Sequence, residues 1–407
     1  MSDEWVETTL AELCAGGSFG DGDWVESKDQ DPSGDFRLLQ LADIGDGLFL
    51  NKSDRWMNEE QFKRLSCTEL QTNDLLIARM PDPIARACLV PEGLPRSATV
   101  VDVAIVRTGD DLLQRFLCLL INGASFRQSA QSLLTGTTRQ RISRGNLAKI
   151  VIRLPPLAVQ RRIVDLMAHL DNHLANLRAE RDRAVKLVRP MIDGLVEGVS
   201  SAPLMRMGAV GEFIRGRRFT KADYVPVGLA CIHYAQIHTH LGSITEEPLT
   251  YVPVEMRTRL RLARTGDVVI AATSEDMDGL GKATVWLGQD EVAVHDDCYI
   301  FRHSLDPVFA TYLFSSSWFQ EQKQRYAAGT KVTRISGKDL AAIEVPVPPI
   351  AVQVRIGLAL RALSASATSI QGEIDSLENV RSQLLSLLLA GEVVLPDSYD
   401  SLLVGVA

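Results

Sequence analysis

The sequence predicts an α+β protein made of two similar mixed α/β domains and two long helices that pair as a coiled coil. The first observation is a repeat: GTTRQRIS at 136–143 returns as GTKVTRIS at 329–336, and LPPLAVQRRI at 154–163 returns as VPPIAVQVRI at 347–356. Both pairs are displaced by 193 residues, and between 136 and 163 fifteen of 28 positions are identical to their partners. The second observation is a long heptad pattern that follows each Pro-Pro.

The two long helices are predicted from apolar residues that alternate spacings of four and three. This repeat of 3.5 residues keeps one stripe of a helix facing a partner, so two such helices in one chain can pair with each other. Each stripe also holds one arginine, Arg181 or Arg381, and Pro190 is expected to kink or end the first helix. The seam residues are Ile163, Met167, Leu170, Leu174 and Leu177 in the first helix, and Ile356, Leu360, Leu363, Ile370, Ile374 and Leu377 in the second.

The elements that precede each long helix also match in order. Buried strands are predicted at 36–44 and 229–237, at 73–79 and 266–272, and at 100–107 and 297–302, followed by helical patterns at 112–134 and 307–327. We therefore predict a first domain at 1–154, a first long helix at 155–199, a second domain at 200–347, a second long helix at 348–395 and a C-terminal tail at 396–407.

Composition and charge favour a soluble globular protein with an uneven electrostatic surface. The net charge is −8, but residues 1–61 hold fifteen acids against four bases, whereas 112–164 holds nine bases and no acid. Such a window is either a solvated face or a footprint for phosphate, and the contrast favours phosphate. No apolar signal core and no apolar run of about 18 residues is present, so we expect a cytoplasmic protein that contacts no membrane. The six scattered cysteines are expected to be reduced core residues.

A search for catalytic chemistry finds no motif that holds together. His169 and His173 lie four residues apart, as helical zinc ligands can, but no third ligand is near, and solvated or interhelical roles are favoured. The segment 278–284 (DGLGKAT) resembles a phosphate loop only weakly, because Ala283 stands where Ser or Thr would hold magnesium. We expect no metal, no cofactor in this chain and no catalytic residue.

The repeated turns and a second basic segment are the candidates for DNA contact. Glycine lets the backbone approach a ligand, and Thr and Arg donate to phosphate oxygens. The equal alternative is that the turns only pack each domain onto its helix. Base reading would need residues that differ between the halves, and Arg79 and Ser274 follow equivalent strands. The predicted DNA-binding residues are Arg79, Arg139, Gln140 and Arg141 in the first half and Arg215, Arg217, Arg218, Ser274, Lys331, Thr333 and Arg334 in the second.

The duplicated design resembles the specificity subunit of type I restriction–modification systems. The resemblance rests on GT…RIS, the PPLAVQRRI and PPIAVQVRI segments and the Leu-rich helix that closes in LLLAGEV at 387–393, and it covers almost the whole chain. The family usually has Glu before the repeated Gln, where this chain has Val159 and Val352.

The resemblance implies a division of labour. Each domain would be a target recognition domain that reads one half of a split double-stranded DNA sequence. The helices would pair antiparallel, set the gap between the halves and dock two methyltransferase subunits, which would carry S-adenosylmethionine and methylate adenine. A translocating endonuclease (restriction) subunit would cut unmodified DNA.

Two alternatives belong to other classes. The chain could be an enzyme with an unrecognised site, although it lacks the usual amino-methylating motif. It could also be a duplicated coiled-coil scaffold without DNA binding, which the acid-free window at 112–164 argues against.

Overall fold

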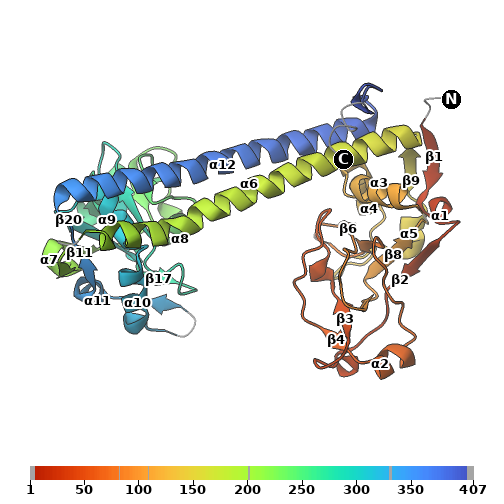
Figure 1. The fold of residues 1–407 in the computed structure, drawn as a ribbon, viewed down its shortest axis with the longest axis horizontal. Helices are drawn as coiled ribbons and strands as arrows, with labels where there is room; N and C mark the ends of the chain where they lie inside the picture. The colour runs from red at the N-terminus through yellow and green to blue at the C-terminus, as the bar shows by residue number, and fades with distance from the viewer. Residues whose placement is uncertain (1–4, 82, 109, 200–201, 330–331, 401–407) are drawn as a thin grey trace. The chain divides into compact units, whose positions relative to one another are not determined.

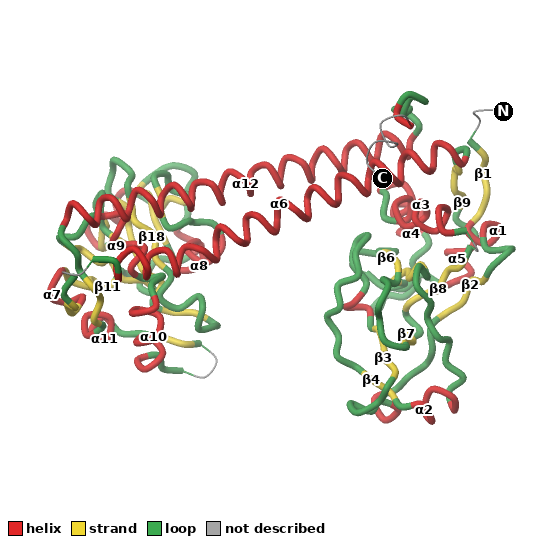
Figure 2. Tube along the Cα trace, viewed as in Figure 1, coloured by secondary structure: helices red, strands yellow, loops and turns green. Residues whose placement is uncertain are grey.

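A computed structural model of the protein describes residues 5–81, 83–108, 110–199, 202–329 and 332–400 (Figure 1). The chain divides into two compact units: Met1–Leu174 with Asp375–Ala407, and Ala175–Ile374. Each unit therefore contains one predicted domain together with the adjoining parts of both long helices. Figure 2 shows that strands and loops dominate each domain, whereas the long helices are continuous.

The first domain contains a four-stranded and a three-stranded sheet. The four-stranded sheet has the order β2-β8-β5-β6 and is antiparallel, and the other has the order β4-β3-β7 with β3 and β7 parallel. A separate pair, β1 with β9, joins the N-terminus to the residues before the long helix. The strands are β1 (Val6–Thr9), β2 (Ser18–Asp21), β3 (Phe36–Leu39), β4 (Trp56–Met57), β5 (Leu75–Ala78), β6 (Ala87–Leu89), β7 (Ser97–Thr99), β8 (Val103–Arg107) and β9 (Val151–Leu154). The helices are α1 (Leu10–Leu13), α2 (Glu59–Arg64), α3 (Asp111–Ile121), α4 (Ala124–Ser132) and α5 (Arg144–Ala148).

The second domain repeats this plan with small additions. Its sheets have the orders β11-β20-β16-β18-β13 and β14-β12-β19-β15, and β10 pairs with β22 as β1 pairs with β9. The strands are β10 (Leu204–Arg206), β11 (Gly211–Arg215), β12 (Leu229–Ile232), β13 (Ile244–Thr245), β14 (Thr250–Val252), β15 (Arg261–Ala263), β16 (Val268–Ala271), β17 (Thr273–Ser274), β18 (Ala283–Trp286), β19 (Val292–Val294), β20 (Cys298–His303), β21 (Thr333–Arg334) and β22 (Glu344–Pro346). The helices are α7 (Met207–Val210), α8 (Tyr234–Thr239), α9 (Pro307–Leu313), α10 (Ser317–Tyr326) and α11 (Gly337–Ala342).

The predicted duplication is thus confirmed at the level of strand order. The central strands β5 and β16 are buried along their whole length, as their uniformly apolar sequences predict. Each is tied to its neighbour by an equivalent ion pair: Arg107 Nε lies 2.6 Å from Asp74 Oδ1, and Arg302 Nη2 lies 2.7 Å from Asp267 Oδ2.

The two long helices, α6 (Leu157–Glu197) and α12 (Ile350–Ala390), pack against each other within each unit (Figure 1). In the first unit Ile163 and Met167 share an apolar cluster with Leu385 and Leu388, so the start of α6 meets the end of α12. In the second unit Ile192 of α6 clusters with Ile356 and Leu360 at the start of α12. The pairing is therefore antiparallel.

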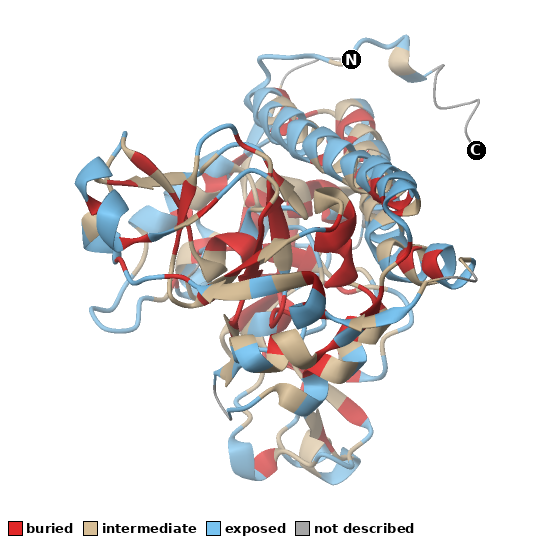
Figure 3. Ribbon diagram, turned by 90° about the vertical axis from the view of Figure 1, so that its left-hand side faces the viewer, coloured by how far each residue is buried: buried red, intermediate tan, exposed pale blue. Residues whose placement is uncertain are grey.

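The seam predicted from the heptads faces inward. Seven of its eleven residues are buried and the other four, Leu170, Leu363, Ile370 and Leu377, are half-buried. Figure 3 shows buried residues inside the domain and exposed ones on the outward faces of the helices. Both seam arginines have polar partners across the pair: Arg381 Nε donates to Asp171 Oδ1 at 2.5 Å, and Arg181 Nη1 donates to Gln371 Oε1 at 2.5 Å.

The helix ends differ from the expectations in two details. Helix α6 continues past Pro190 to Glu197, so Pro190 does not end it. Helix α12 stops at Ala390 rather than at 395. The next residue, Gly391, adopts a φ of +74°, a conformation that favours glycine and commonly ends a helix. By length and apolar composition alone α12 could cross a membrane, which is weak grounds for a span because its buried face packs on α6 and the domains.

The cysteines match the expectation of reduced core residues. All six are free and buried. Burial raises the pKa of Cys67, Cys88 and Cys118 to about 12 each, so these thiols stay protonated at neutral pH.

Candidate nucleic-acid interface

The repeated GT…RIS segments form equivalent tight turns. Thr135 and Arg141 are bridged antiparallel in the first domain, as Ala328 and Arg334 are in the second. The turn glycines have left-handed φ values, +96° at Gly136 and +122° at Gly329. A Cβ at either would lie within 2.6 Å of a carbonyl oxygen of the same turn, which explains why both copies have glycine.

The Ile and Ser that both copies share have structural roles. Ile142 and Ile335 are buried, and their amides donate to Arg79 O at 2.9 Å and to Ala272 O at 3.1 Å. Ser143 and Ser336 are the N-caps of α5 and α11. The packing alternative therefore accounts for Ile and Ser, and does not account for the exposed Arg139 and Gln140 of the first turn.

The repeated glutamine of the Pro-Pro segment is structural as well. Gln160 Nε2 donates to Pro155 O and Gln353 Nε2 donates to Pro348 O, each at 2.8 Å. Both side chains are buried, so they fix the turn that leads into each long helix.

In the first domain the turn borders a cleft of about 640 Å³. The predicted residues Arg139 and Arg141 line it together with Trp24, Gln40 and Met80. The guanidinium groups lie 3.6 Å and 3.4 Å from the two oxygens of Asp102, and the Arg139 side chain remains 75% exposed. Gln140 is exposed at the same turn.

Arg79 does not reach this surface. Its side chain is 4% exposed, its Nη1 lies 3.0 Å from Asp21 Oδ1, and its Nη2 donates to Val101 O. Burial lowers the pKa of Arg79, and Asp21 opposes that effect. Arg79 is therefore an internal cation that holds the ends of two strands together, and its burial argues against the predicted base contact.

In the second domain a smaller cleft of about 270 Å³ lies beside the equivalent turn. Arg215 and Arg334, which are 119 positions apart in the sequence, line it with Tyr299 and Tyr326. Thr333 is half-buried and pairs with Ser274 between β21 and β17. Ser274 is 1% exposed and its Oγ accepts a hydrogen bond from the Asp276 amide, so its burial also argues against the predicted base contact. Lys331 lies outside the described residues.

The basic segment 215–221 is held to the domain by a histidine. His295 Nε2 bonds Phe219 O at 2.9 Å, and His295 Nδ1 lies 2.8 Å from Asp297 Oδ2. Burial disfavours charge on either group, but their mutual hydrogen bond and attraction outweigh it, so the pKa of His295 is raised and that of Asp297 lowered. Arg217 Nη1 donates to Arg259 O at 3.4 Å, and Arg218 is exposed.

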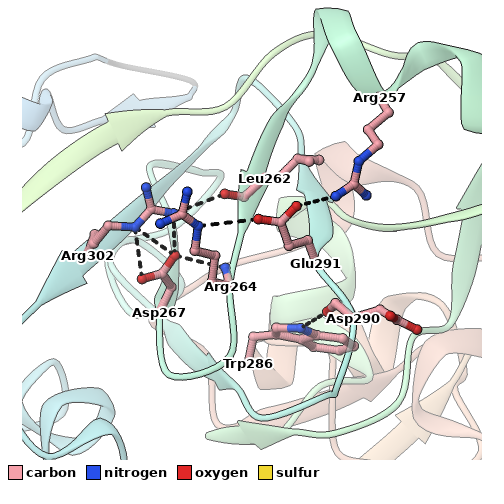
Figure 4. Close-up of polar contacts among 8 residues, drawn as sticks. All are labelled: Arg257, Leu262, Arg264, Asp267, Trp286, Asp290, Glu291 and Arg302. Atoms are coloured by element: carbon pink, nitrogen blue, oxygen red, sulfur yellow. Dashed lines mark hydrogen bonds and ion pairs between the residues drawn. The ribbon is translucent and has the colours of Figure 1, made fainter.

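Other arginines of the second domain are already engaged in ion pairs (Figure 4). Glu291 lies between Arg257 and Arg264, with Arg264 Nε 3.3 Å from Glu291 Oε1, and Arg302 holds Asp267. These guanidinium groups brace the sheet and are not free for a ligand. By contrast, Arg215, Arg218 and Arg334 have no carboxylate partner among the described residues.

One exposed aromatic was missed by the sequence search. Trp24 is 67% exposed at the rim of the first cleft, and its Nε1 donates to Glu26 Oε1 at 3.4 Å. It stands in the acidic segment DGDWVES, which a search for basic clusters passes over. The signal that could have found it is a large aromatic residue within a Gly/Asp-rich loop.

Over the described residues no group of three or more metal-ligating side chains is found. His169 Nδ1 lies 2.7 Å from Asp165 O on the exposed surface of α6. The fold and clefts thus define a class of duplicated protein, in which two equivalent domains each have a cleft beside the repeated turn.

Known proteins with similar sequences or folds indicate which class of protein this is. The profile of the family described as type I restriction modification DNA specificity domain matches residues 2–186. The type I restriction enzyme MjaVIII specificity subunit of Methanocaldococcus jannaschii is 21% identical over 285 residues, which is 65% of this chain and 67% of that protein. The chain spans about two thirds of the length of the curated relatives that it matches.

Two solved structures share the fold over nearly the full chain. One, described in terms of complex assembly and conformational transition of the type I R-M system, has a TM-score of 0.58 at 19% identity and covers 97% of this chain and 99% of its own. The S subunit of the type I restriction–modification system from M. genitalium has a TM-score of 0.54 at 15% identity, with 95% and 96% covered. Residues 2–186 thus match the type I restriction modification DNA specificity domain, and the comparisons together support a DNA specificity subunit of a type I restriction–modification system.

Proposed function

We propose that each domain reads one half of a bipartite double-stranded DNA target and that the cleft beside the repeated turn is the reading surface. The observation that carries this proposal is the duplication: two domains with the same strand order present the same turn, with Arg141 and Arg334 at equivalent positions. The shared Ile and Ser hold the turns in place, whereas Arg139 and Gln140 of the first turn correspond to Val332 and Thr333 of the second. Two equivalent frames with unlike clefts suit the reading of two unlike half-sequences.

The proposed role of α6 and α12 is to set the gap between the half-sites and to dock the partner subunits. The antiparallel seam supports a spacer, because it ties the start of each helix to the end of the other. Exposed apolar residues on the outward faces, such as Leu157, Val185 and Leu358, support docking. The partners we propose are two methyltransferase subunits, which would carry S-adenosylmethionine, and translocating restriction subunits. The proposed compartment is the cytoplasm.

The test is charge reversal at the turns in the full-length chain assembled with its methyltransferase partner. Arg139→Glu with Arg141→Glu should abolish specific binding to the target duplex, since guanidinium groups at the cleft would become phosphate-repelling carboxylates. The matched control is Arg115→Glu, an exposed base of the same acid-free window that lies on α3. Equal binding by the wild-type and the double variant would favour a scaffold without DNA contact.

A further inference from the structure

The two domains carry opposite charges at structurally equivalent positions. Asp21 pairs with Ala104 at the end of β2, and Arg215 pairs with Tyr299 at the end of β11. β8 and β20, which carry Ala104 and Tyr299, occupy the same place in their sheets. Asp21 and Arg215 therefore occupy the same position.

The glycine that follows confirms the correspondence. A Cβ at Gly22 would lie 2.3 Å from Val100 O, and one at Gly216 would lie 2.0 Å from His295 O, so the two backbones make the same close approach. From this shared frame, 21–28 has three acids and one lysine, a local charge of −2, whereas 215–222 has three arginines and one lysine, a local charge of +4.

An internal substitution accompanies this reversal. The Arg79 amide donates to Asp102 O and the Ala272 amide donates to Asp297 O, each at 2.9 Å, so Arg79 and Ala272 are equivalent. Where the first domain has the internal pair Asp21–Arg79, the second has Arg215 and Ala272.

The same backbone carbonyl is satisfied in both domains, but from different positions. In the first domain Arg79 Nη2 donates to Val101 O, and in the second Arg215 Nε donates to the equivalent Asp296 O at 3.0 Å. The arginine that donates to this carbonyl is therefore an internal residue after β5 in the first domain and the last residue of β11 in the second. Its guanidinium group changes from a buried, neutralised cation to one at the surface.

The space that Arg79 fills in the first domain is open in the second. Ala272, Arg215 and Arg334 line the cleft of about 270 Å³. Among the described residues, neither Arg215 nor Arg334 has a carboxylate within 4.0 Å. The two carboxylates that line the cleft have donors of their own: Asp296 lies 3.3 Å from His295 Nδ1, and Asp339 accepts from Ser336 Oγ at 2.6 Å.

We propose that the second domain binds a DNA backbone phosphate between Arg215 and Arg334, and that Asp21 and Arg79 close the equivalent place in the first domain. Guanidinium groups suit this role because they donate two parallel hydrogen bonds to phosphate oxygens. Arg217, Arg218 and Lys221 extend the positive surface along the same segment. The choice of DNA as the source of the phosphate rests on the proposed function. At this place in the fold the second domain then contributes a salt-dependent phosphate contact that the first domain lacks.

The test transplants the internal pair from one domain to the other. Arg215→Asp with Ala272→Arg gives the second domain the pair of the first, and Asp21→Arg with Arg79→Ala is the mirror exchange. Full-length chains are titrated into a labelled duplex of arbitrary sequence at several salt concentrations, because phosphate contact is independent of sequence. The first exchange should weaken binding roughly tenfold. It should also make the negative slope of log K against log salt shallower by about 0.9. The mirror exchange should make this negative slope steeper by a similar amount.

Folding is checked by far-UV circular dichroism. Should the double variant not fold, Arg215→Ala takes its place, since it removes no internal ion pair and is expected to lower the slope by the same amount. Unchanged affinity and slope in a folded second-domain variant overturn the inference. So does a variant that binds DNA normally but no longer assembles with its methyltransferase partner, because the arginines would then serve a protein interface.

A parallel titration with the target duplex separates this inference from the proposed function. Preference of the wild-type chain for its target with no effect of the exchange contradicts only the phosphate site. A slope that falls as expected without any preference for a target supports the phosphate site and contradicts the reading of half-sites.

Discussion

At the scale of single residues, the polar side chains that the sequence suggests for DNA contact are of two kinds, buried ones with internal partners and exposed ones. Arg79 and Ser274 follow equivalent strands, as predicted, yet both are buried. Sequence patterns place a residue on a strand or turn, but they do not tell whether an arginine is already neutralised by an aspartate distant in sequence. Asp21 and Arg79 are 58 positions apart, and only the sheet brings them together. Trp24 was missed for a different reason, because it stands in an acidic segment and the search looked for basic clusters.

The pair Arg107–Asp74 should be important for stability. Asp74 is 3% exposed and accepts from both Nε and Nη2 of Arg107 at 2.6 Å. Asp74→Asn should lower the free energy of unfolding of the first domain by about 3 kcal/mol, since it leaves a half-buried guanidinium without its counter-charge. Urea denaturation measures this, with Lys63→Ala as the control: the exposed Lys63–Glu59 pair should be worth less than about 1 kcal/mol.

The pair His295–Asp297 predicts a pH dependence for the second domain. The pKa of His295 is raised in the folded chain, so its stabilisation is complete below the unfolded value near 6.5 and is lost as pH rises through the folded value. Asp297 has a lowered pKa and contributes above its unfolded value near 3.8. His295→Gln should therefore cost about 1–2 kcal/mol at pH 5.5 and less at pH 8. Thermal unfolding at the two pH values measures this, and an equal loss at both would rule out the ionised pair.

At the scale of elements, the sequence was most informative where the pattern was long. The heptads predicted both helices and the inward direction of the seam, because a stripe sustained over many turns has few alternative explanations. The ends were less predictable: Pro190 is tolerated within α6, and α12 ends at Ala390. The small strands β17 and β21 were not predicted, since two-residue strands have no period to detect.

A charge in the seam should destabilise the helix pair. Met167 is 1% exposed among Leu385, Leu388 and Phe116. Met167→Asp should lower stability by roughly 3–5 kcal/mol, because it buries an unpaired carboxylate in an apolar cluster. Val185→Asp on the same helix is the control: Val185 is 57% exposed, so a change within about 0.5 kcal/mol is expected in the same denaturation experiment. Equal losses would mean that the stripe does not define the packed face.

At the scale of the whole molecule, duplication was predictable from the chain, whereas the difference between the copies was not. The displacement of 193 residues predicted two equivalent domains, and the strand orders confirm them. That Asp21 in one copy corresponds to Arg215 in the other emerges only from the strand registers, because small insertions change the displacement between them.

Helix length should control the spacing of the target. Inserting four residues, about one turn, at a site within the segment 179–183 of α6 should change the gap between the two half-sites. Both half-sequences should stay unaltered. Methylation patterns of cells that contain the variant and its proposed methyltransferase partner measure the gap. Altered half-sequences at an unchanged gap would contradict the spacer role.

The most direct measurement maps methylated bases in DNA from cells that contain the proposed methyltransferase partner, with and without this chain. The account predicts that the chain adds one methylated motif made of two separate half-sequences at a fixed gap, and that Arg139→Ala with Arg141→Ala relaxes only one half. Methylation that does not depend on this chain, or a single uninterrupted motif, would contradict it.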